Sequence, residues 1–202
     1  VPFKDRRGEW GNQFSIGYSL YTPYNYASEM SAFGFDEAYG YSSELPLIEF
    51  QYTIKRNFLW GSIGAELGVG MYQNTSDLDE IDSELQLIPI RLGAVLILDT
   101  LTRIPYIAPY IAGGAYTMVF EETQDGENTY GGNTQMAPYF SFGTQINLDW
   151  IDPLSSRQGY EDSGIQATFL YVEGRKFMAS AAERDNDFEN DIEPNMGLRI
   201  EF

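Results

Sequence analysis

The sequence predicts an all-β protein folded as an eight-stranded antiparallel up-and-down transmembrane β-barrel. Apolar and polar side chains alternate with a period of two from one end of the chain to the other, and helical spacing is hard to find. Aromatic residues make up 15% of the chain and Gly is frequent, a composition that favours strands. Long acidic connections alternate with mostly short ones, which is typical of a barrel with two different ends.

Eight segments carry the alternation: residues 10–22, 45–55, 59–72, 86–98, 106–120, 138–150, 165–173 and 193–202. The fourth and fifth are apolar on both sides for part of their length, so only Arg91 marks a polar face there. In the seventh, we expect Ala167, Phe169 and Tyr171 to form the apolar face, opposite polar neighbours. The long connections are expected at about residues 23–43, 73–84, 121–135 and 173–193, and residues 151–164 form a sixth connection longer than this scheme requires.

The two strand faces indicate which solvent lies on which side of the barrel. One face is bulky and aromatic, as with Phe14, Ile16 and Tyr18, and the other carries Gly, Ser, Gln and isolated charges. The interior of an eight-stranded barrel is narrow enough for side chains to fill, which suits small residues. We therefore expect the apolar face to meet lipid, where a closed barrel leaves no backbone group unpaired. No apolar run reaches the roughly 20 residues that a membrane helix needs.

Composition excludes several function classes. The chain has 12 basic and 30 acidic residues, a formal net charge of -18, which repels nucleic acid. It has no Cys and no His, so disulfides, thiolate metal sites and hydrolytic triads built on His are excluded. We expect no enzyme activity, no cofactor and no bound metal. The acidic spacing Asp185, Asp187, Glu189, Asp191, Glu193 only weakly suggests a cation site, because it lacks the glycine and distal Glu of a calcium-binding loop.

Charged residues on the polar face are candidates for ion pairs in the lumen. They are Glu49, Lys55, Glu66, Arg91, Arg199 and Glu201. An unpaired ion in a narrow, poorly hydrated interior suffers a desolvation cost of several kcal/mol, so we expect pairing. The preferred bridge joins Glu66 to Arg91 or Arg199, and Glu49, Lys55 and Glu201 are expected nearer the short-turn end. Such a network forms either a structural plug or a constricted ion path, and both interpretations stay open.

Aromatic residues near the strand ends are candidates for interfacial girdles at the two membrane surfaces. They are Tyr18, Tyr52, Trp60, Tyr72, Tyr116 and Trp150. The alternative is that each is simply a residue that favours strands.

The C-terminal stretch MGLRIEF alternates to its last residue. With the barrel pattern, it resembles the small outer-membrane β-barrel proteins of Gram-negative bacteria, such as the OmpA transmembrane domain and the OmpX and OmpW types. The resemblance implies a bacterial outer-membrane location, surrounded by lipid and lipopolysaccharide. It implies a periplasmic N-terminal arm at residues 1–9 and a barrel at residues 10–202, closed by pairing of the last strand with the first. Met196, Leu198, Ile200 and Phe202 would be the signal read by the barrel-assembly machinery, or alternatively an ordinary lipid-facing strand.

Three roles follow as hypotheses. The first is a structural or interaction barrel with a plugged lumen, as an accessory subunit of an envelope assembly with other envelope proteins. The second is a narrow channel or a conduit for small hydrophobic molecules, as the OmpW type implies. The third is a solitary barrel that stabilises the membrane. Catalysis gains no support from the resemblance, because barrel enzymes of this kind rely on His, which is absent here.

Overall fold

The computed structural model describes residues 3–28, 33–40, 45–76, 83–100, 106–124, 128–182 and 184–202. Parts of the predicted acidic connections, at residues 77–82 and 125–127, lie outside the described residues, as does the linker at residues 101–105.

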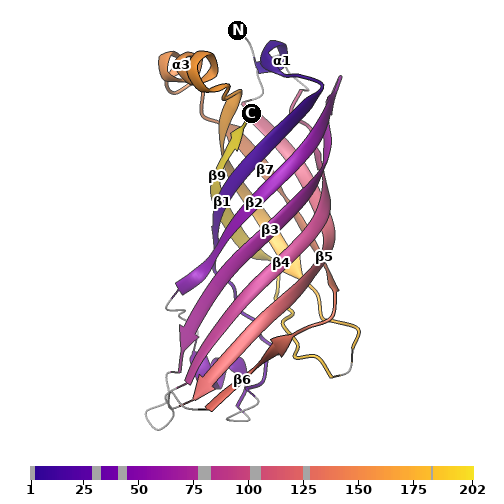
Figure 1. Cartoon of the computed structure of the whole chain (residues 1–202), viewed down its shortest axis with the longest axis vertical. Helices are drawn as coiled ribbons and strands as arrows, with labels where there is room; N and C mark the ends of the chain where they lie inside the picture. The colour runs from indigo at the N-terminus through magenta and orange to yellow at the C-terminus, as the bar shows by residue number, and fades with distance from the viewer. Residues whose placement is uncertain are drawn as a thin grey trace.

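The structure is a closed antiparallel barrel of eight strands (Figure 1). The barrel strands are β1 (Trp10–Ser19), β2 (Leu45–Phe58), β3 (Gly61–Thr75), β4 (Ser83–Ile97), β5 (Ile107–Gln124), β7 (Ala137–Asn147), β8 (Ala167–Phe177) and β9 (Glu193–Glu201). Each strand pairs with the next along the chain, and β9 closes the barrel by pairing with β1 from Ser19↔Asn195 to Gln13↔Glu201. The predicted fold class is confirmed.

One predicted connection is a hairpin. Residues 121–135 were expected to form a loop, but β5 continues to Gln124 and turns back as β6 (Asn128–Asn133). The register runs from Val119↔Asn133 to Gln124↔Asn128. The expectation was wrong because the alternation of β5 does not stop where the barrel wall ends: Met118 and Phe120 point inward and so does the polar Glu122 that follows them.

Three short helices lie at the barrel ends: α1 (Phe3–Arg6), α2 (Phe35–Tyr39) and α3 (Pro153–Ser163). Helix α3 occupies the long sixth connection. Its Asp152 cap accepts a hydrogen bond from Ser155 N at 3.1 Å, Pro153 begins the first turn, and Gly164 ends the helix at φ 71° in the left-handed region. No described helix is long and apolar enough to span a membrane.

Figure 1 shows the two ends. The N-terminus, the C-terminus, α1 and α3 lie together at one end, here called the turn end, where β2 and β3 are joined by the two residues Leu59 and Trp60. Strand β6 lies at the opposite end, here called the loop end.

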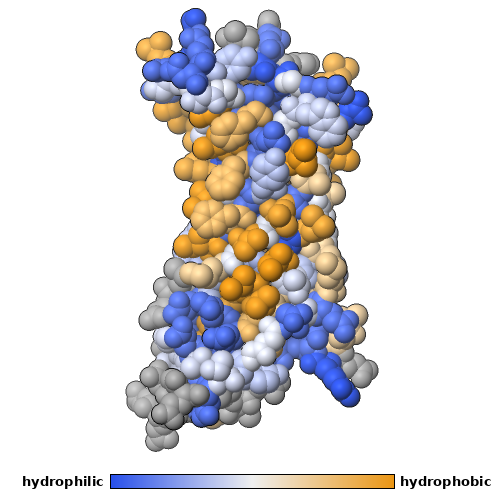
Figure 2. All heavy atoms as spheres, in the orientation of Figure 1, coloured by the Kyte–Doolittle hydropathy of each residue, from blue (hydrophilic) through white to orange (hydrophobic). Residues whose placement is uncertain are grey.

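The strand faces are divided as the alternation predicts. Along β1, Gln13, Ser15 and Ser19 are buried, whereas Phe14 and Ile16 are 44% and 42% exposed. On the face shown in Figure 2, exposed apolar side chains gather over the middle of the molecule and hydrophilic residues are more frequent toward both ends. The apolar face therefore points outward and the polar face inward.

Strand β8 is an exception to the predicted facing. Ala167, Phe169 and Tyr171 were expected to form the outward apolar face, yet each is at most 1% exposed and points inward. Val172, by contrast, is 39% exposed. The prediction failed because both faces of this strand carry apolar residues. Register decides the facing, since Phe169 lies opposite the inward Arg199 of β9.

Candidate functional site

Arg91 is the centre of an ion-pair network in the middle of the barrel. Its Nε lies 2.6 Å from Glu49 Oε1, and its Nη1 lies 2.7 Å from Glu66 Oε1. Its Nη2 donates to Gln51 Oε1 at 3.0 Å. The guanidinium also lies over the Tyr139 ring, 5.3 Å from its centroid, and the Tyr139 hydroxyl donates to Glu66 at 2.7 Å. All donors and acceptors come from inward positions of β2, β3, β4 and β7, so the network spans the lumen.

Arg175 and Glu173 of β8 extend this network, and sequence reasoning missed both. Arg175 forms ion pairs with Glu49 and with Glu173. Glu173 also accepts hydrogen bonds from the Tyr110 hydroxyl at 2.6 Å and from Asn195 Nδ2 at 3.0 Å. The signal was present in the alternation Tyr171, Glu173, Arg175, but the predicted strand ended at residue 173.

Arg199 does not share the partners of Arg91. Its Nε donates to Ser15 Oγ at 2.8 Å, and its guanidinium lies over the rings of Tyr171 and Tyr110, 4.7 Å and 5.1 Å from their centroids. No carboxylate of the described residues lies within ion-pair distance of it. Of the two predicted bridges from Glu66, the structure contains the one to Arg91.

A second network of ion pairs lies at the turn end. Lys55 Nζ lies 2.9 Å from Asp99 Oδ2 and 2.8 Å from Glu201 Oε2. Arg7 donates to both oxygens of Asp99, at 3.0 Å and 2.9 Å. Lys55 and Glu201 are thus at the expected end. Glu49 is not, because β2 begins at the loop end and Glu49 is one of its first residues.

The N-terminal arm takes part in this network. Arg7 reaches into the lumen with a side chain only 3% exposed. Phe3 of α1 is also buried and packs edge-on against Phe169, with ring centroids 5.9 Å apart. Sequence reasoning assigned residues 1–9 to a separate arm, and the alternation gave no sign that this segment packs against the barrel.

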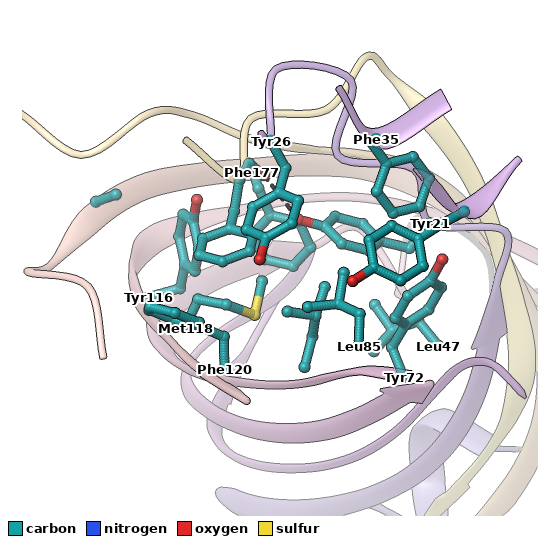
Figure 3. Close-up of a cluster of buried hydrophobic side chains, with 14 of the residues drawn as sticks. Tyr21, Tyr26, Phe35, Leu47, Tyr72, Leu85, Tyr116, Met118, Phe120 and Phe177 are labelled. Atoms are coloured by element: carbon teal, nitrogen blue, oxygen red, sulfur yellow. Dashed lines mark hydrogen bonds between the residues drawn. The ribbon is translucent and has the colours of Figure 1, made fainter. Parts of the chain in front are cut away.

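Buried aromatic side chains gather at the loop end (Figure 3). The buried cluster comprises Tyr21, Tyr26, Phe35, Ala38, Tyr39, Leu47, Tyr72, Leu85, Leu87, Tyr116, Met118, Phe120, Ala137, Tyr139, Phe177 and Phe188. Figure 3 shows side chains from several strands and from the first connection meeting across the barrel mouth. The cluster is therefore a buried aromatic core at the loop end of the barrel.

A buried carboxylate holds the first connection onto this cluster. Glu122 accepts hydrogen bonds from the hydroxyls of Tyr26 at 3.0 Å and Tyr39 at 2.6 Å, and from Ser28 Oγ. Burial raises the pKa of Tyr39 well above its ordinary value, and the hydrogen bond to Glu122 adds to this. Tyr39 is therefore a hydrogen-bond donor throughout the neutral range.

Two of the residues predicted to lie in the interfacial girdles point into the barrel instead. Tyr72 and Tyr116 are 1% and 2% exposed and belong to the aromatic cluster. The alternation itself indicates this for Tyr72, because its neighbour Met71 belongs to the outward set and is 43% exposed. The other predicted girdle residues point outward, with exposed fractions between 44% and 57%: Tyr18, Tyr52, Trp60 and Trp150.

The acidic segment before β9 uses its carboxylates in local contacts. Asp185 accepts from Gln135 N at 2.6 Å, Glu189 pairs with Lys176 at 2.8 Å, and Glu193 accepts from Thr22 N at 2.9 Å. Among the residues that the structure describes, no group of acidic side chains has the geometry to hold a metal ion.

Polarity is distributed oppositely to that of a water-soluble barrel. Fully buried charges such as Arg91 and Lys55 line the inside, and residues such as Leu92 and Ile111, 58% and 59% exposed, cover the outside. A closed barrel with an apolar outer band is the arrangement that crosses a bilayer with strands. The chain is a β-barrel of the transmembrane type.

No protein-family model matches the chain, and the comparison with curated proteins finds no match. Among solved structures, the chain is similar to the N-terminal β-barrel domain of Pseudomonas aeruginosa OprF, at a TM-score of 0.47 and 10% identity, covering 96% of this chain and 98% of that one. It is also similar to Neisserial surface protein A (NspA), at a TM-score of 0.41 and 9% identity, covering 96% of each chain.

Proposed function

We propose that this chain is an outer-membrane barrel with a sealed interior, which acts through its exposed ends and neither conducts solutes nor catalyses a reaction. The proposal rests on the burial and pairing of charged side chains in the lumen. Arg91 is 1% exposed and forms ion pairs with Glu49 and Glu66. Lys55 is 0% exposed and forms ion pairs with Asp99 and Glu201.

The free-energy cost of breaking buried ion pairs supports a sealed lumen. Removing one partner from a buried ion pair costs about 3–5 kcal/mol, because the remaining charge is left uncompensated. A solute that passed through the lumen would have to separate the pairs at two levels, around Arg91 and around Lys55. It would also have to displace the aromatic cluster at the loop end. An open water-filled path is therefore strongly disfavoured.

Conductance across planar bilayers tests this proposal. We expect the full-length barrel to show no steady conductance, while a water-filled porin in the same bilayer conducts. Arg91→Met combined with Glu49→Gln and Glu66→Gln removes three central charges and leaves the pair of Arg175 with Glu173. We expect this variant to stay closed because that pair, the turn-end network and the aromatic cluster remain. A large steady conductance from the unchanged protein would overturn the proposal in favour of a channel.

Helix α3 favours a role as an accessory subunit of an envelope assembly. A minimal barrel needs only a short turn here, yet the chain builds an eleven-residue helix with no buried residue. Leu154 is 81% exposed and Ile151 is 64% exposed. Exposed apolar side chains on an element that adds nothing to the barrel core are suited to contact another protein at the turn end.

Gentle detergent extraction followed by native mass measurement tests the accessory role. We expect a co-purifying envelope protein, which is lost when residues 153–163 are replaced by a short turn. The matched control is Arg157→Ala, which changes only the exposed pair of Arg157 with Glu161 and is expected to retain the partner. A monomer with no co-purifying chain would leave a solitary membrane-stabilising barrel.

A further inference from the structure

A cavity of about 580 Å³ lies at the loop end, where the pairing of β1 with β9 stops. The last paired residues are Ser19 and Asn195, and just beyond them the chain carries Pro194 in β9 and Pro46 in β2. Proline has no N–H to donate, and the pairing of β1 with both neighbours ends here, while β9 stays paired with β8 through Pro194 and Glu193. The cavity fills the resulting gap, and its volume is within the range of about 300–1,000 Å³ typical of small-ligand pockets.

The cavity is walled by aromatic side chains. Tyr21, Phe35 and Tyr72 are buried residues of the aromatic cluster, while Tyr18 and Tyr24 are 44% and 46% exposed at its rim. The rings of Tyr21 and Tyr72 meet edge to face, with centroids 5.7 Å apart. Figure 3 shows Phe35, Tyr21 and Tyr72 on the same side of the barrel mouth.

Two carboxyl groups, those of Glu193 and Asp191, belong to the lining of this cavity, and no basic side chain of the described residues does. Glu193 is 7% exposed, and its two oxygens accept from Thr22 N at 2.9 Å and Asn190 Nδ2 at 2.7 Å. Both donors are neutral, and no basic side chain of the described residues lies within ion-pair distance of Glu193 or lines the cavity. Asp191, also in the lining, is exposed and adds a second carboxylate.

We propose that this cavity binds an organic ammonium group. Aromatic rings attract cations through their electron-rich faces. Quaternary and substituted ammonium groups are the ligands that cages of aromatic side chains recognise. A buried carboxylate beside those rings supplies the counter-charge. A metal ion fits less well, because hard cations require six to eight oxygen ligands and the described lining offers few carboxylates. The chain's net charge of -18 raises the local concentration of any cation near the mouth.

Binding of choline, compared with that of its uncharged isostere 3,3-dimethylbutan-1-ol, tests the proposal. The barrel is studied in maltoside micelles, which contain no ammonium group, and binding is measured by titration calorimetry. We expect choline to bind at least tenfold more tightly than the isostere. Equal affinities would overturn the proposal, because they would show that the cavity recognises shape and apolar surface and not positive charge.

Two matched variants locate the site. Glu193→Gln keeps an acceptor for Thr22 N but removes the charge, and we expect it to weaken choline binding at least tenfold without changing binding of the isostere. Glu189→Gln removes the same charge from the same segment, at a carboxylate that pairs with Lys176 outside the cavity. It should change choline affinity less than twofold. Equal effects of the two variants would indicate diffuse attraction and refute a built site.

Tyr24, at the rim of the cavity, provides a second test if Glu193→Gln folds poorly. Tyr24→Leu changes a half-exposed ring, and we expect at least threefold weaker choline binding with unchanged isostere binding. An unchanged choline affinity would refute the aromatic contribution and with it the proposal.

The source of the ammonium group is decided in vesicles. Choline binding is compared in vesicles of phosphatidylglycerol alone and of phosphatidylglycerol with phosphatidylethanolamine. Competition by the second lipid identifies a lipid headgroup as the ligand, and undiminished choline binding identifies a water-borne amine. Both results support ammonium recognition, whereas absence of choline binding in both kinds of vesicle refutes it. The test is independent of whether the lumen conducts.

Discussion

Arg91 Nη1 and the Tyr139 hydroxyl both bind the same oxygen of Glu66, each at 2.7 Å, while Gln51 Nε2 binds the other oxygen of Glu66 at 2.7 Å. The carboxylate is therefore satisfied on both sides by groups from β2, β4 and β7. The members of a buried network of this kind strengthen one another, so the loss of one weakens the contacts of the others.

Arg91→Met should lower the free energy of unfolding by about 3–5 kcal/mol, because Glu49 and Glu66 are left as buried charges without their cation. Urea unfolding in lipid vesicles, followed by circular dichroism, measures the loss. Adding Glu66→Gln should cost less than the sum of the two single changes. The control cycle combines Glu66→Gln with Arg199→Met, and we expect additivity within about 0.5 kcal/mol because these two residues share no described partner. Strict additivity in the first cycle would contradict a coupled network.

Lys55 and Arg56 are neighbours on opposite faces of β2. Lys55 is fully buried between Asp99 and Glu201, whereas Arg56 pairs with Glu9 on the surface, where both side chains are more than half exposed. Lys55→Met should lower the free energy of unfolding by about 3–5 kcal/mol. Arg56→Met should lower it by less than about 1 kcal/mol. Similar losses in the two variants would show that the turn-end network is hydrated and does not seal the barrel.

Tyr39→Phe removes the hydroxyl that donates to Glu122 at 2.6 Å. Hydrogen bonds to charged groups contribute about 1.5–3 kcal/mol, so the first connection should open more often from the barrel mouth. Limited proteolysis of intact barrels in vesicles should cut faster around residues 33–40. Tyr130→Phe, which changes a 40% exposed ring on β6, is the control and should leave the cutting rate unchanged. An unaltered rate in Tyr39→Phe would show that Glu122 does not retain this connection.

Gly93 of β4 lies directly against the Tyr139 side chain. A Cβ there would collide with the Tyr139 hydroxyl and would lie 2.7 Å from Gly113 O. Gly93→Ala should therefore cost about 1–3 kcal/mol through overpacking and should displace Tyr139 from Glu66. Gly34→Ala has open space around the new methyl group and an ordinary φ of -66°, so its effect should stay within about 0.5 kcal/mol. Unfolding midpoints of the two variants, measured side by side, test this difference.

Phe202 pairs with β1 through its backbone: Phe202 N donates to Asn12 O at 2.8 Å, and Asn12 N donates to Phe202 O at 3.1 Å. Its side chain is 43% exposed on the outer face, as are Met196 and Leu198 at 49% and 48%. If these side chains are read by assembly machinery, Phe202→Asn should reduce the amount of folded barrel in cell membranes. Refolding of the purified variant into detergent should be little affected, since the backbone pairing remains. Equal losses in the two settings would assign Phe202 a structural role alone.

Sequence alternation predicted the eight barrel strands and the outward position of the apolar face, whereas the closure of β9 on β1 was implied by the resemblance to outer-membrane barrels. The strands and their facing follow from the period of two, because each strand needs only its own side chains to separate two faces. The inward positions of Glu49, Glu66, Arg91, Arg199 and Glu201 followed in the same way. The sequence also indicated Tyr72 as an inward residue, although girdle chemistry was wrongly preferred for it.

Only the tertiary structure decided which inward residues meet. Arg91 pairs with Glu49 and Glu66 while Arg199 lies between Tyr110 and Tyr171, and no periodicity distinguishes these two arginines. The reason is geometric: strand tilt and stagger set the height of each side chain in the lumen, and they are properties of the closed barrel and not of any one strand. The same holds for β8, whose inward face was decided only by register, and for Phe3 and Arg7, whose partners Phe169 and Asp99 lie far away in the sequence.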